Sequence, residues 1–175
     1  MLSEKRILVT GVATPDSIAY AIARFCHAAG ARVVLTAFPR DLEATAELAR
    51  TIGPDIEAWA LDLTDIGQLE TVTQRAADRL GGLDGAVHAV AFAPRPALAG
   101  PLTAAGPGDV ELAFRSSTWT LAALARILAP LTPPAGGSLV GLDFDSQRAW
   151  PVYHWMGVCK AALRSTAQYL ARDLG

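Results

Sequence analysis

Short apolar runs alternate along the chain with longer segments in which apolar residues recur every three or four positions. The short runs have the length and composition of buried strands. They predict strands at residues 6–10, 32–36, 57–61, 83–92 and 138–142. The longer segments have the periodicity of amphipathic helices. They predict helices at residues 17–29, 42–52, about 65–80, roughly 110–131 and 151–174.

The predicted strands are apolar throughout rather than alternating, as the runs ILV, VVL, AVHAV and SLVGL show. Such strands occur in sheets that are covered by helices on both faces. Strand–helix–strand repetition with short links requires right-handed parallel crossovers. We therefore predict a single α/β domain, residues 1–175, with a Rossmann-like doubly wound parallel sheet of strand order 3-2-1-4-5.

Residues suited to helix ends support these boundaries. Gly30 follows the first predicted helix, at a position where a left-handed residue is common. Asp41 is a suitable N-cap for the second helix, and Thr64 or Asp65 for the third.

Composition narrows the classes of function. The 175 residues are 51% hydrophobic and 18% charged, which excludes a disordered chain, and the formal charge of −2 gives no basic surface for nucleic acid. The most apolar stretch, LAALARILAPL, contains Arg126 and is too short to span a membrane. The apolar run near the N-terminus is too short for a signal peptide. With Cys26 and Cys159 far apart in the sequence, we expect a reduced, cytoplasmic protein.

Two classes of catalytic centre find no support in the sequence. No group of His, Cys and acidic residues has the spacing of metal ligands, so we expect no metal. No G-x-S-x-G motif indicates a serine hydrolase. His88 lies inside an apolar run and is expected to be a core imidazole rather than a catalyst.

The first turn, TGVATPDSIAYAIA, is a candidate phosphate site, since ligands of parallel sheets bind beyond the carboxyl ends of the strands. Gly11 follows the strand directly and allows close approach of a phosphate. Ser17 opens the helix, whose N-terminus attracts anions. The usual G-x-G-x-x-G motif is absent, because positions 13 and 16 are Ala and Asp. An ordinary capped turn is an equally good interpretation of these residues.

The ends of the next two strands offer further contacts to a nucleotide. Phe38 could stack on an adenine and Arg40 could face a 2′-phosphate, or the two could be a packed ring and a solvated charge. Asp62 could accept a hydrogen bond from the adenine amino group while also capping the next helix. These residues do not decide between NAD and NADP.

The segment PVYHWMGVCKAAL places Tyr153 and Lys160 seven residues apart on a predicted helix, so both side chains are expected on one face. A phenol serves acid–base chemistry near neutral pH only if its anion is stabilised, and a nearby ammonium group lowers its pKa. We therefore expect Lys160 to lower the pKa of Tyr153. Taken alone, the pair could also be two ordinary surface residues.

These features together resemble a known superfamily. The turn Gly11-x5-Ser17-Ile18-Ala19 and the pair Tyr153 and Lys160 are similar to those of the short-chain dehydrogenases/reductases. Within that superfamily the chain resembles the NADH-dependent enoyl-acyl-carrier-protein reductases. The segment GGSLVGLDFDSQRAWPVYHWMGVCKAALRSTAQYLARDLG resembles the mycolate-pathway type most specifically, and the similarity extends over nearly the whole chain.

The resemblance implies reduction of a trans-2-enoyl thioester, carried by acyl carrier protein or CoA, with NADH as cofactor. Tyr153 would hydrogen-bond the thioester oxygen and Lys160 would hold the cofactor ribose. Ketoreductases of the superfamily place a serine near the end of the fifth strand, but here position 140 is Val and Phe144 precedes Tyr153. Because a phenyl ring cannot donate to an oxyanion, we expect enoyl rather than keto reduction.

Family roles can be carried over to matching positions. The resemblance assigns the catalytic role to Tyr153, Lys160 and Phe144. It assigns substrate contacts to Tyr153, Phe92 and Met156. It assigns cofactor contacts to Gly11, Val12, Ser17, Ile18, Phe38, Asp62, Leu63, Ala89, Val90, Ala91, Leu142, Asp143 and Lys160. Ala89 and Ala91 replace the family's usual serine and glycine, so weaker NADH binding is expected.

The family's sequences continue beyond the position that matches Gly175. That part supplies two more strands, a loop over the nicotinamide and mobile substrate-binding helices, so we expect this chain to be C-terminally truncated. A non-catalytic nucleotide-binding module, or an inactive fragment, is therefore the alternative function, and a ketoreductase is the third. A homo-oligomer, a tetramer by analogy with the family, is also expected.

Overall fold

The computed structural model describes residues 2–175, which group into two compact units. Unit 1 contains residues 2–89 and 124–140, and unit 2 contains residues 90–123 and 141–175. The prediction of a single domain stays a prediction. No helix in residues 2–175 combines the length and apolarity that crossing a bilayer requires.

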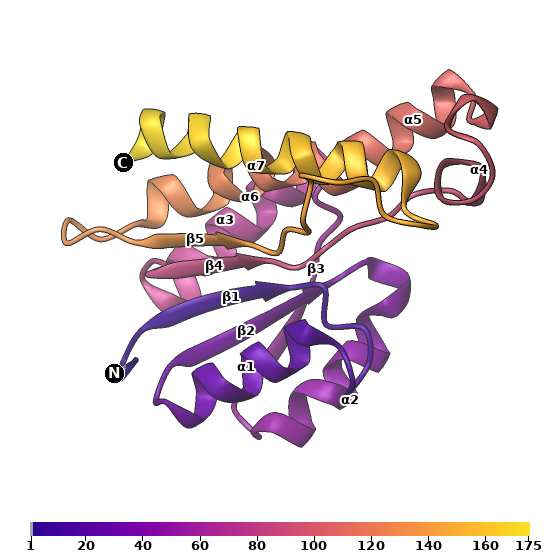
Figure 1. Ribbon diagram of the computed structural model, residues 1–175. Helices are drawn as coiled ribbons and strands as arrows, with labels where there is room; N and C mark the ends of the chain where they lie inside the picture. The colour runs from indigo at the N-terminus through magenta and orange to yellow at the C-terminus, as the bar shows by residue number, and fades with distance from the viewer. Residues whose placement is uncertain (1) are drawn as a thin grey trace. The chain divides into compact units, whose positions relative to one another are not determined.

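Unit 1 is built on a five-stranded sheet whose order, β3-β2-β1-β4-β5, confirms the predicted doubly wound topology (Figure 1). β1 pairs in parallel with β2 and β4, and β2 pairs in parallel with β3. The strands are β1 (Arg6–Thr10), β2 (Arg32–Ala37), β3 (Glu57–Ala60), β4 (Gly85–His88) and β5 (Ser138–Gly141). Parallel pairing brings the carboxyl ends of β1, β2 and β3 to one edge, where the candidate residues of unit 1 lie.

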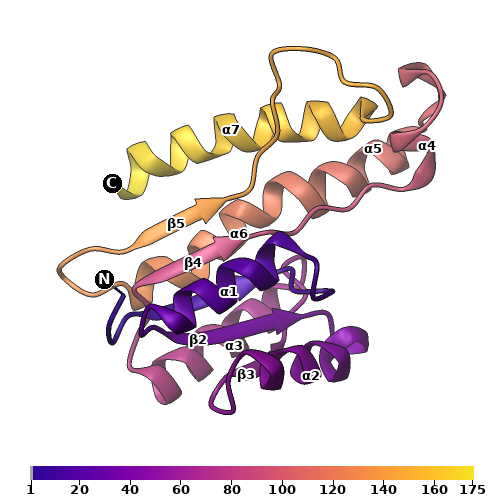
Figure 2. The same cartoon turned by 60° about the horizontal axis from the view of Figure 1, so that its bottom comes forward.

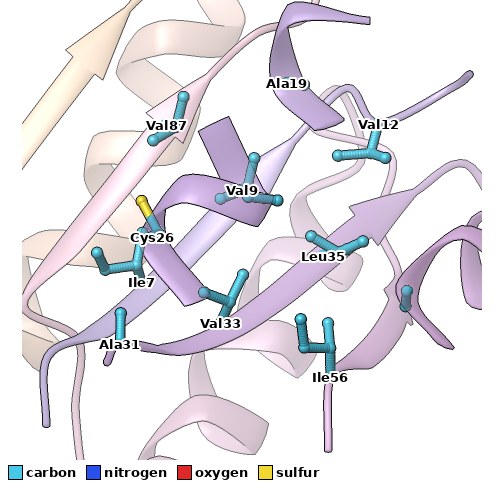
Figure 3. Packing of buried hydrophobic residues seen from close by; sticks show 12 residues of the cluster. Ile7, Val9, Val12, Ala19, Cys26, Ala31, Val33, Leu35, Ile56 and Val87 are labelled. Atoms are coloured by element: carbon cyan, nitrogen blue, oxygen red, sulfur yellow. The ribbon is translucent and has the colours of Figure 1, made fainter. Parts of the chain in front are cut away.

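Helices cover both faces of this sheet over β1, β2 and β4, whose residues are mostly buried. The expectation of a covered strand is wrong for β5, where three of the four residues are exposed. The covering helices are α1 (Ile18–Ala28), α2 (Leu42–Ile52) and α3 (Ile66–Leu80). α1 and α2 lie together on one face and α3 lies on the other, as the turned view in Figure 2 also shows. Alternate strand residues therefore enter different cores. Val9 and Leu35 pack in the α1–α2 core, which Figure 3 shows, whereas Leu8 is fully buried without belonging to that cluster.

The ends of these helices follow local chemistry. Asp65 is the N-cap of α3 and its carboxylate accepts a hydrogen bond from the Gln68 backbone N–H, which confirms one of the two predicted caps. Gly30 has the predicted left-handed conformation, with φ +91°. The prediction for Asp41 is wrong in part: it occupies the N-cap position of α2, but its side chain makes no capping bond. Its carboxylate pairs with Arg40 instead, at 3.5 Å.

β4 is shorter than the strand predicted over residues 83–92, because it spans only Gly85–His88. Beyond it, Phe92 has both backbone groups bonded to one side chain. The Ser117 hydroxyl accepts a hydrogen bond from the Phe92 N–H at 2.9 Å and donates to the Phe92 carbonyl at 2.8 Å. Phe92 is thus satisfied without a neighbouring strand, which a reading of hydrophobicity alone could not anticipate.

The helix predicted over residues 110–131 is instead segmented. The segments are α5 (Pro107–Phe114), a π-helical stretch (Arg115–Trp119), α6 (Thr120–Leu128) and a 3₁₀ turn (Ala129–Leu131). α6 runs from unit 2 into unit 1. The π-helical stretch includes Ser117 and Thr118, whose hydroxyls bond the backbone at Phe92 and Cys159. Such stretches commonly occur near functional residues.

Unit 2 also contains α4 (Arg95–Leu98), a 3₁₀ turn (Leu102–Ala104) and α7 (His154–Leu174). The buried side chains of this unit come from α4, α5, α7 and the segment before α4. They are Ala93, Ala97, Ala113, Met156 and Cys159. This small core holds the first two turns of α7, which carry the residues through Lys160.

Candidate functional site

The turn after β1 has features that suit an anion such as a phosphate. Gly11 has φ +82°, a conformation that favours glycine, and its missing side chain leaves the backbone accessible. The first turn of α1, which begins with Ile18, carries no carboxylate, and the first N–H groups of a helix have no partner inside it. The side chain of Ile18 is exposed, with 66% of its surface accessible. The predicted phosphate site at this turn therefore remains a candidate.

Ser17 has a structural role in this turn. Its hydroxyl donates to the Thr14 carbonyl at 2.8 Å and accepts from the Tyr20 backbone N–H at 3.2 Å. The serine thus caps α1, which agrees with the alternative interpretation of this turn. The cap uses the Tyr20 N–H, so the first-turn N–H groups that lie outside it are those of Ile18 and Ala19. Val12 is buried in the α1–α2 core, and its carbonyl accepts a hydrogen bond from Thr45, so its side chain has no exposed surface to offer a ligand.

Thr10 was not singled out by the sequence, although it links the ends of two strands. Its hydroxyl donates to the Val87 carbonyl at 2.9 Å and accepts from the Ala89 N–H at 3.1 Å. This brings predicted residues Gly11 and Ala89 close together in unit 1. The sequence feature that could have indicated Thr10 is its place between the apolar run ILV and Gly11. His88, the residue before Ala89, is fully buried, as expected.

The residues predicted at the ends of β2 and β3 lie at neighbouring strands of unit 1. Phe38 is exposed, and the Arg40 guanidinium carbon lies 5.2 Å from the centre of its ring. Asp62 accepts two hydrogen bonds at one carboxylate oxygen, from the backbone N–H and the hydroxyl of Thr64. Leu63 is buried. The helix cap is Asp65 and not Asp62, so the carboxylate of Asp62 shapes the turn before the helix.

In unit 2 the predicted residues after β4 differ in exposure. Val90 is half-buried and Ala91 and Phe92 are exposed. Met156, predicted to contact substrate, is buried in the unit 2 core. The two exposed residues are accessible to a ligand, whereas Met156 contributes packing.

Lys160 is a buried cation near the start of α7. Only 7% of its surface is exposed, and its Nζ donates to the Leu142 carbonyl at 2.6 Å. Burial lowers the pKa of Lys160, while the charges of Asp143 and Cys159 act in the opposite direction. The Asp143 carboxylate also lies 3.6 Å from the guanidinium of Arg164. Lys160 is therefore held by the segment after β5.

Tyr153 is not on the helix, which corrects the predicted start of α7 at residue 151. α7 begins at His154 and Tyr153 is its N-cap, with φ −124°. The residues on either side, Val152 and His154, have φ +54° and +34°, a conformation that side chains disfavour. The seven-residue helical spacing between Tyr153 and Lys160 therefore does not describe their geometry.

The pKa of Tyr153 moves in the direction opposite to the prediction. Burial raises the pKa of its phenol, and the charges of Asp143 and Cys159 raise it further. Lys160 is not among the groups that shift it, and the Lys160 ammonium group donates to the Leu142 carbonyl. The phenol is half-buried and stays protonated at neutral pH, so it can act as a hydrogen-bond donor.

Phe144 packs directly against Tyr153. The ring centres are 4.6 Å apart and the ring planes are inclined by 48°. Tyr153 also borders a cavity of about 720 Å³ in unit 2. Its lining includes Leu102, Trp150, His154, Val158 and Ala161. Unit 2 thus packs the Tyr153 phenol against the Phe144 ring. It also holds the Lys160 ammonium against the segment of Leu142 and Asp143.

No group of three His, Cys, Asp or Glu side chains within residues 2–175 is arranged to hold a metal ion. The Tyr153 phenol can donate one hydrogen bond to an oxygen atom placed beside it.

Comparison with known proteins identifies the family. The family model described as enoyl-(acyl carrier protein) reductase matches residues 11–175. The chain is 37% identical over 179 residues to the enoyl-[acyl-carrier-protein] reductase [NADH] of Mycolicibacterium smegmatis and 39% identical over 178 residues to that of Mycobacterium avium. Each match covers 100% of this chain and 66% of the relative.

A relative with lower sequence identity has the same enzyme name. The enoyl-[acyl-carrier-protein] reductase [NADH] FabI of Aquifex aeolicus is 34% identical over 99% of this chain and 65% of its own length. This chain therefore spans slightly less than two thirds of these relatives. The chain belongs to the enoyl-(acyl carrier protein) reductase family.

Proposed function

We propose that this chain carries the nucleotide-binding and catalytic residues of an NADH-dependent reductase of trans-2-enoyl thioesters, which acts on acyl-carrier-protein or CoA thioesters in fatty-acid biosynthesis. The observation that carries the proposal is the similarity, over 99–100% of the chain, to relatives of that name. The residues described above support the proposal, because the turn after β1, Tyr153 and Lys160 each have surroundings suited to one part of cofactor binding or reduction.

Unit 1 is proposed to bind the adenosine and pyrophosphate part of NADH. The backbone at Gly11 and the N-terminal N–H groups of α1 suit the pyrophosphate, and exposed Phe38 suits one face of the adenine. Asp62 keeps one carboxylate oxygen outside its bonds to Thr64 and is proposed to accept from the adenine amino group. Ala89, and Ala91 of unit 2, are proposed to weaken NADH binding relative to the family.

Tyr153 is proposed to stabilise the charge that develops during reduction. NADH, when bound, supplies the hydride that adds to the β-carbon of the enoyl thioester, and negative charge then develops on the thioester oxygen. The raised pKa keeps the Tyr153 phenol protonated, so the phenol can donate to that oxygen. The protonated phenol thus acts as a hydrogen-bond donor rather than as a base.

Lys160 is proposed to orient the cofactor ribose. An ammonium group has three N–H donors, and one of them is used by the Leu142 carbonyl. The others are suited to ribose hydroxyls. The bond to Leu142 fixes the direction of Nζ, and Asp143 favours the charged form.

Phe144 is proposed to separate enoyl from keto reduction. The Phe144 ring has no hydrogen-bond donor for a carbonyl oxygen. Of the two rings in contact, only Tyr153 can donate a hydrogen bond, through its phenol. A flat conjugated thioester suits such a ring. Exposed Phe92 is proposed to contact the acyl chain, and Met156 to support this region from the unit 2 core.

Assembly and location are also proposals. We expect a homo-oligomer, a tetramer by family analogy, in the cytoplasm. The two cysteines are free and buried, which supports a reducing compartment. Light scattering would measure the number of subunits.

The function is tested by mixing the purified 175-residue chain with NADH and a trans-2-enoyl thioester and following loss of NADH absorbance. Turnover that is lost in Tyr153→Phe supports the proposal. Calorimetric binding of NADH without turnover would favour a nucleotide-binding module, and no binding by a folded chain would favour an inactive fragment. Turnover of a β-keto thioester instead would identify a ketoreductase.

A further inference from the structure

Three aromatic rings form a contiguous cluster in unit 2. The Phe144 ring lies between the other two, 4.6 Å from the centre of Tyr153 and 5.5 Å from the centre of Trp150, the latter in an edge-to-face arrangement. Both separations and the inclined planes are typical of favourable ring pairs. Phe144 is therefore the intermediate through which Trp150 can act on Tyr153.

Trp150 is itself held at two points. Its indole N–H donates to the Asp145 carbonyl at 3.0 Å, and the Arg148 guanidinium carbon lies 5.3 Å from the centre of its ring. Arg148 also pairs with the Asp145 carboxylate at 3.4 Å, and the other oxygen of that carboxylate accepts the Gln147 N–H at 2.9 Å. Asp145, Arg148 and Trp150 thus form a closed set of contacts, which we call the loop brace.

The phenol needs such support, because the backbone around it is strained. Val152 and His154 both have positive φ, and Val152 is β-branched. Residues in this conformation persist only where surrounding contacts stabilise them. Tyr153 belongs to no helix that would determine its direction, so contacts with the loop before it have that effect.

The loop brace contributes little to the core. Trp150 is 37% exposed, and the Arg148 side chain is 71% exposed. Trp150 instead lines the cavity that Tyr153 borders. The Trp150 ring is partly exposed, is bonded to its own loop and contacts Phe144. It is therefore better suited to orienting the Tyr153 phenol than to stabilising the whole fold.

We propose that Trp150, held by Asp145 and Arg148, is a positioning residue that acts through Phe144 to set the orientation and burial of the Tyr153 phenol. Its catalytic meaning rests on the function proposed above, whereas its effect on the phenol does not. The brace makes the hydrogen-bond donor of Tyr153 available in one direction before a substrate binds.

The first test is a spectrophotometric titration of phenolate absorbance, with the Tyr153 signal identified by difference from Tyr153→Phe. Asp143 and Cys159 raise the pKa of this phenol, and both also act on Lys160. Arg148 and His154 line the cavity that the phenol borders, and all five groups remain in Trp150→Leu. We expect that variant to expose the phenol and lower its pKa by about half a pH unit or more toward the ordinary value of about 10. Trp150→Phe keeps a ring beside Phe144 and should stay closer to the unmodified chain.

Trp119→Leu is the matched control, because Trp119 lines a different cavity of unit 2. It should leave the phenol titration unchanged. Equal shifts in the leucine variants at 119 and 150, or no shift at 150 in a chain whose circular dichroism shows it folded, would overturn the proposal.

The second test is kinetic. If the chain reduces enoyl thioesters, Trp150→Leu should lower kcat about tenfold or more with a smaller change in KM, and Trp150→Phe should restore most of the loss. Equal losses in both variants, or a change confined to KM, would overturn the positioning role. Absence of turnover in the unmodified chain would count against the proposed function, while the titration would still decide the effect of Trp150 on the phenol.

Discussion

The ammonium nitrogen of Lys160 lies 2.6 Å from the carbonyl oxygen of Leu142 and donates to it. The bond joins the first part of α7 to the segment that follows β5. A lysine buried to this extent would be costly without such a partner. The cation is thus directed by the backbone and not by the phenol of Tyr153.

Replacing Lys160 with methionine should weaken NADH binding while changing the stability of the fold only slightly. Methionine keeps an apolar stem while removing both the buried charge and its bond to Leu142, and these two effects oppose each other. We expect the free energy of unfolding at neutral pH to change by less than about 1 kcal/mol. NADH affinity should fall about tenfold or more, measured by calorimetry.

The difference in stability between the wild type and the Lys160→Met variant should depend on pH in a definite direction. Because burial lowers the folded-state pKa of Lys160 below 10.5, the unfolded chain binds the proton more tightly. Wild-type stability should therefore rise relative to the methionine variant as the pH increases from the folded-state pKa toward 10.5. A constant difference in urea unfolding across that window would contradict this account.

Asp84 should make unit 1 sensitive to acid. Its carboxylate accepts the Arg6 Nε at 2.7 Å and the Lys5 Nζ at 3.1 Å, and the hydrogen bond from Arg6 is the main cause that lowers its pKa to about 2. The resulting stabilisation is complete above the unfolded value of 3.8 and is lost as the pH falls through about 2.

Asp84→Asn should therefore cost about 1–2 kcal/mol at pH 7, with a difference that shrinks below pH 4. Denaturant unfolding across this range measures it. Asp41→Asn is the control, since the Arg40–Asp41 pair is exposed on both sides and should contribute almost nothing. Equal effects of the two substitutions at pH 7 would be inconsistent with a specific role for Asp84.

Gly11→Ala should destabilise unit 1 by about 1 kcal/mol, because φ +82° is unfavourable for a residue with a Cβ. It should also weaken NADH binding, since the methyl group would lie where a phosphate is expected. Gly67→Ala, in the first turn of α3 with only the Asp65 carboxylate nearby, should be neutral or slightly stabilising. Unchanged calorimetric affinity in the Gly11 variant would argue against a phosphate at this turn.

Ser117→Ala should destabilise unit 2 by about 1–3 kcal/mol, because both backbone groups of Phe92 lose their partner. Ser116→Ala changes a neighbouring hydroxyl that takes no part in holding Phe92 and should have a much smaller effect. Thermal unfolding of the two variants provides the comparison. Similar melting temperatures would mean that water replaces the hydroxyl without cost.

Much of the fold could be predicted from the sequence because the strands of unit 1 are continuous apolar runs separated by helical periodicity. The failures have local causes. Beyond His88 the backbone bonds side chains that are distant in sequence, since the Ala89 N–H donates to Thr10 and the Phe92 N–H donates to Ser117. α7 begins late because Val152 and His154 adopt positive φ, which neither residue's propensity favours.

The candidate site was only partly predictable. The residue types at Tyr153 and Lys160 indicated the chemistry, but the direction of the phenol's pKa depends on burial and on Asp143, which spacing does not report. Periodicity likewise could not indicate that Met156 would be buried in the unit 2 core or that Trp150 would contact Phe144. Contacts between side chains of an irregular loop have no repeating pattern from which to infer them.

The order of the strands sets how fast each exchanges its amide hydrogens in deuterated water. β1 lies between β2 and β4, whereas β3 and β5 are the outermost strands of the sheet that residues 2–175 form. Amides on the outer sides of β3 and β5 can exchange from the folded state, while those of β1 wait for the strands beside it to separate. The backbone leading to Gly11, like β2 and β4, is therefore labelled more slowly than the outer sides of β3 and β5.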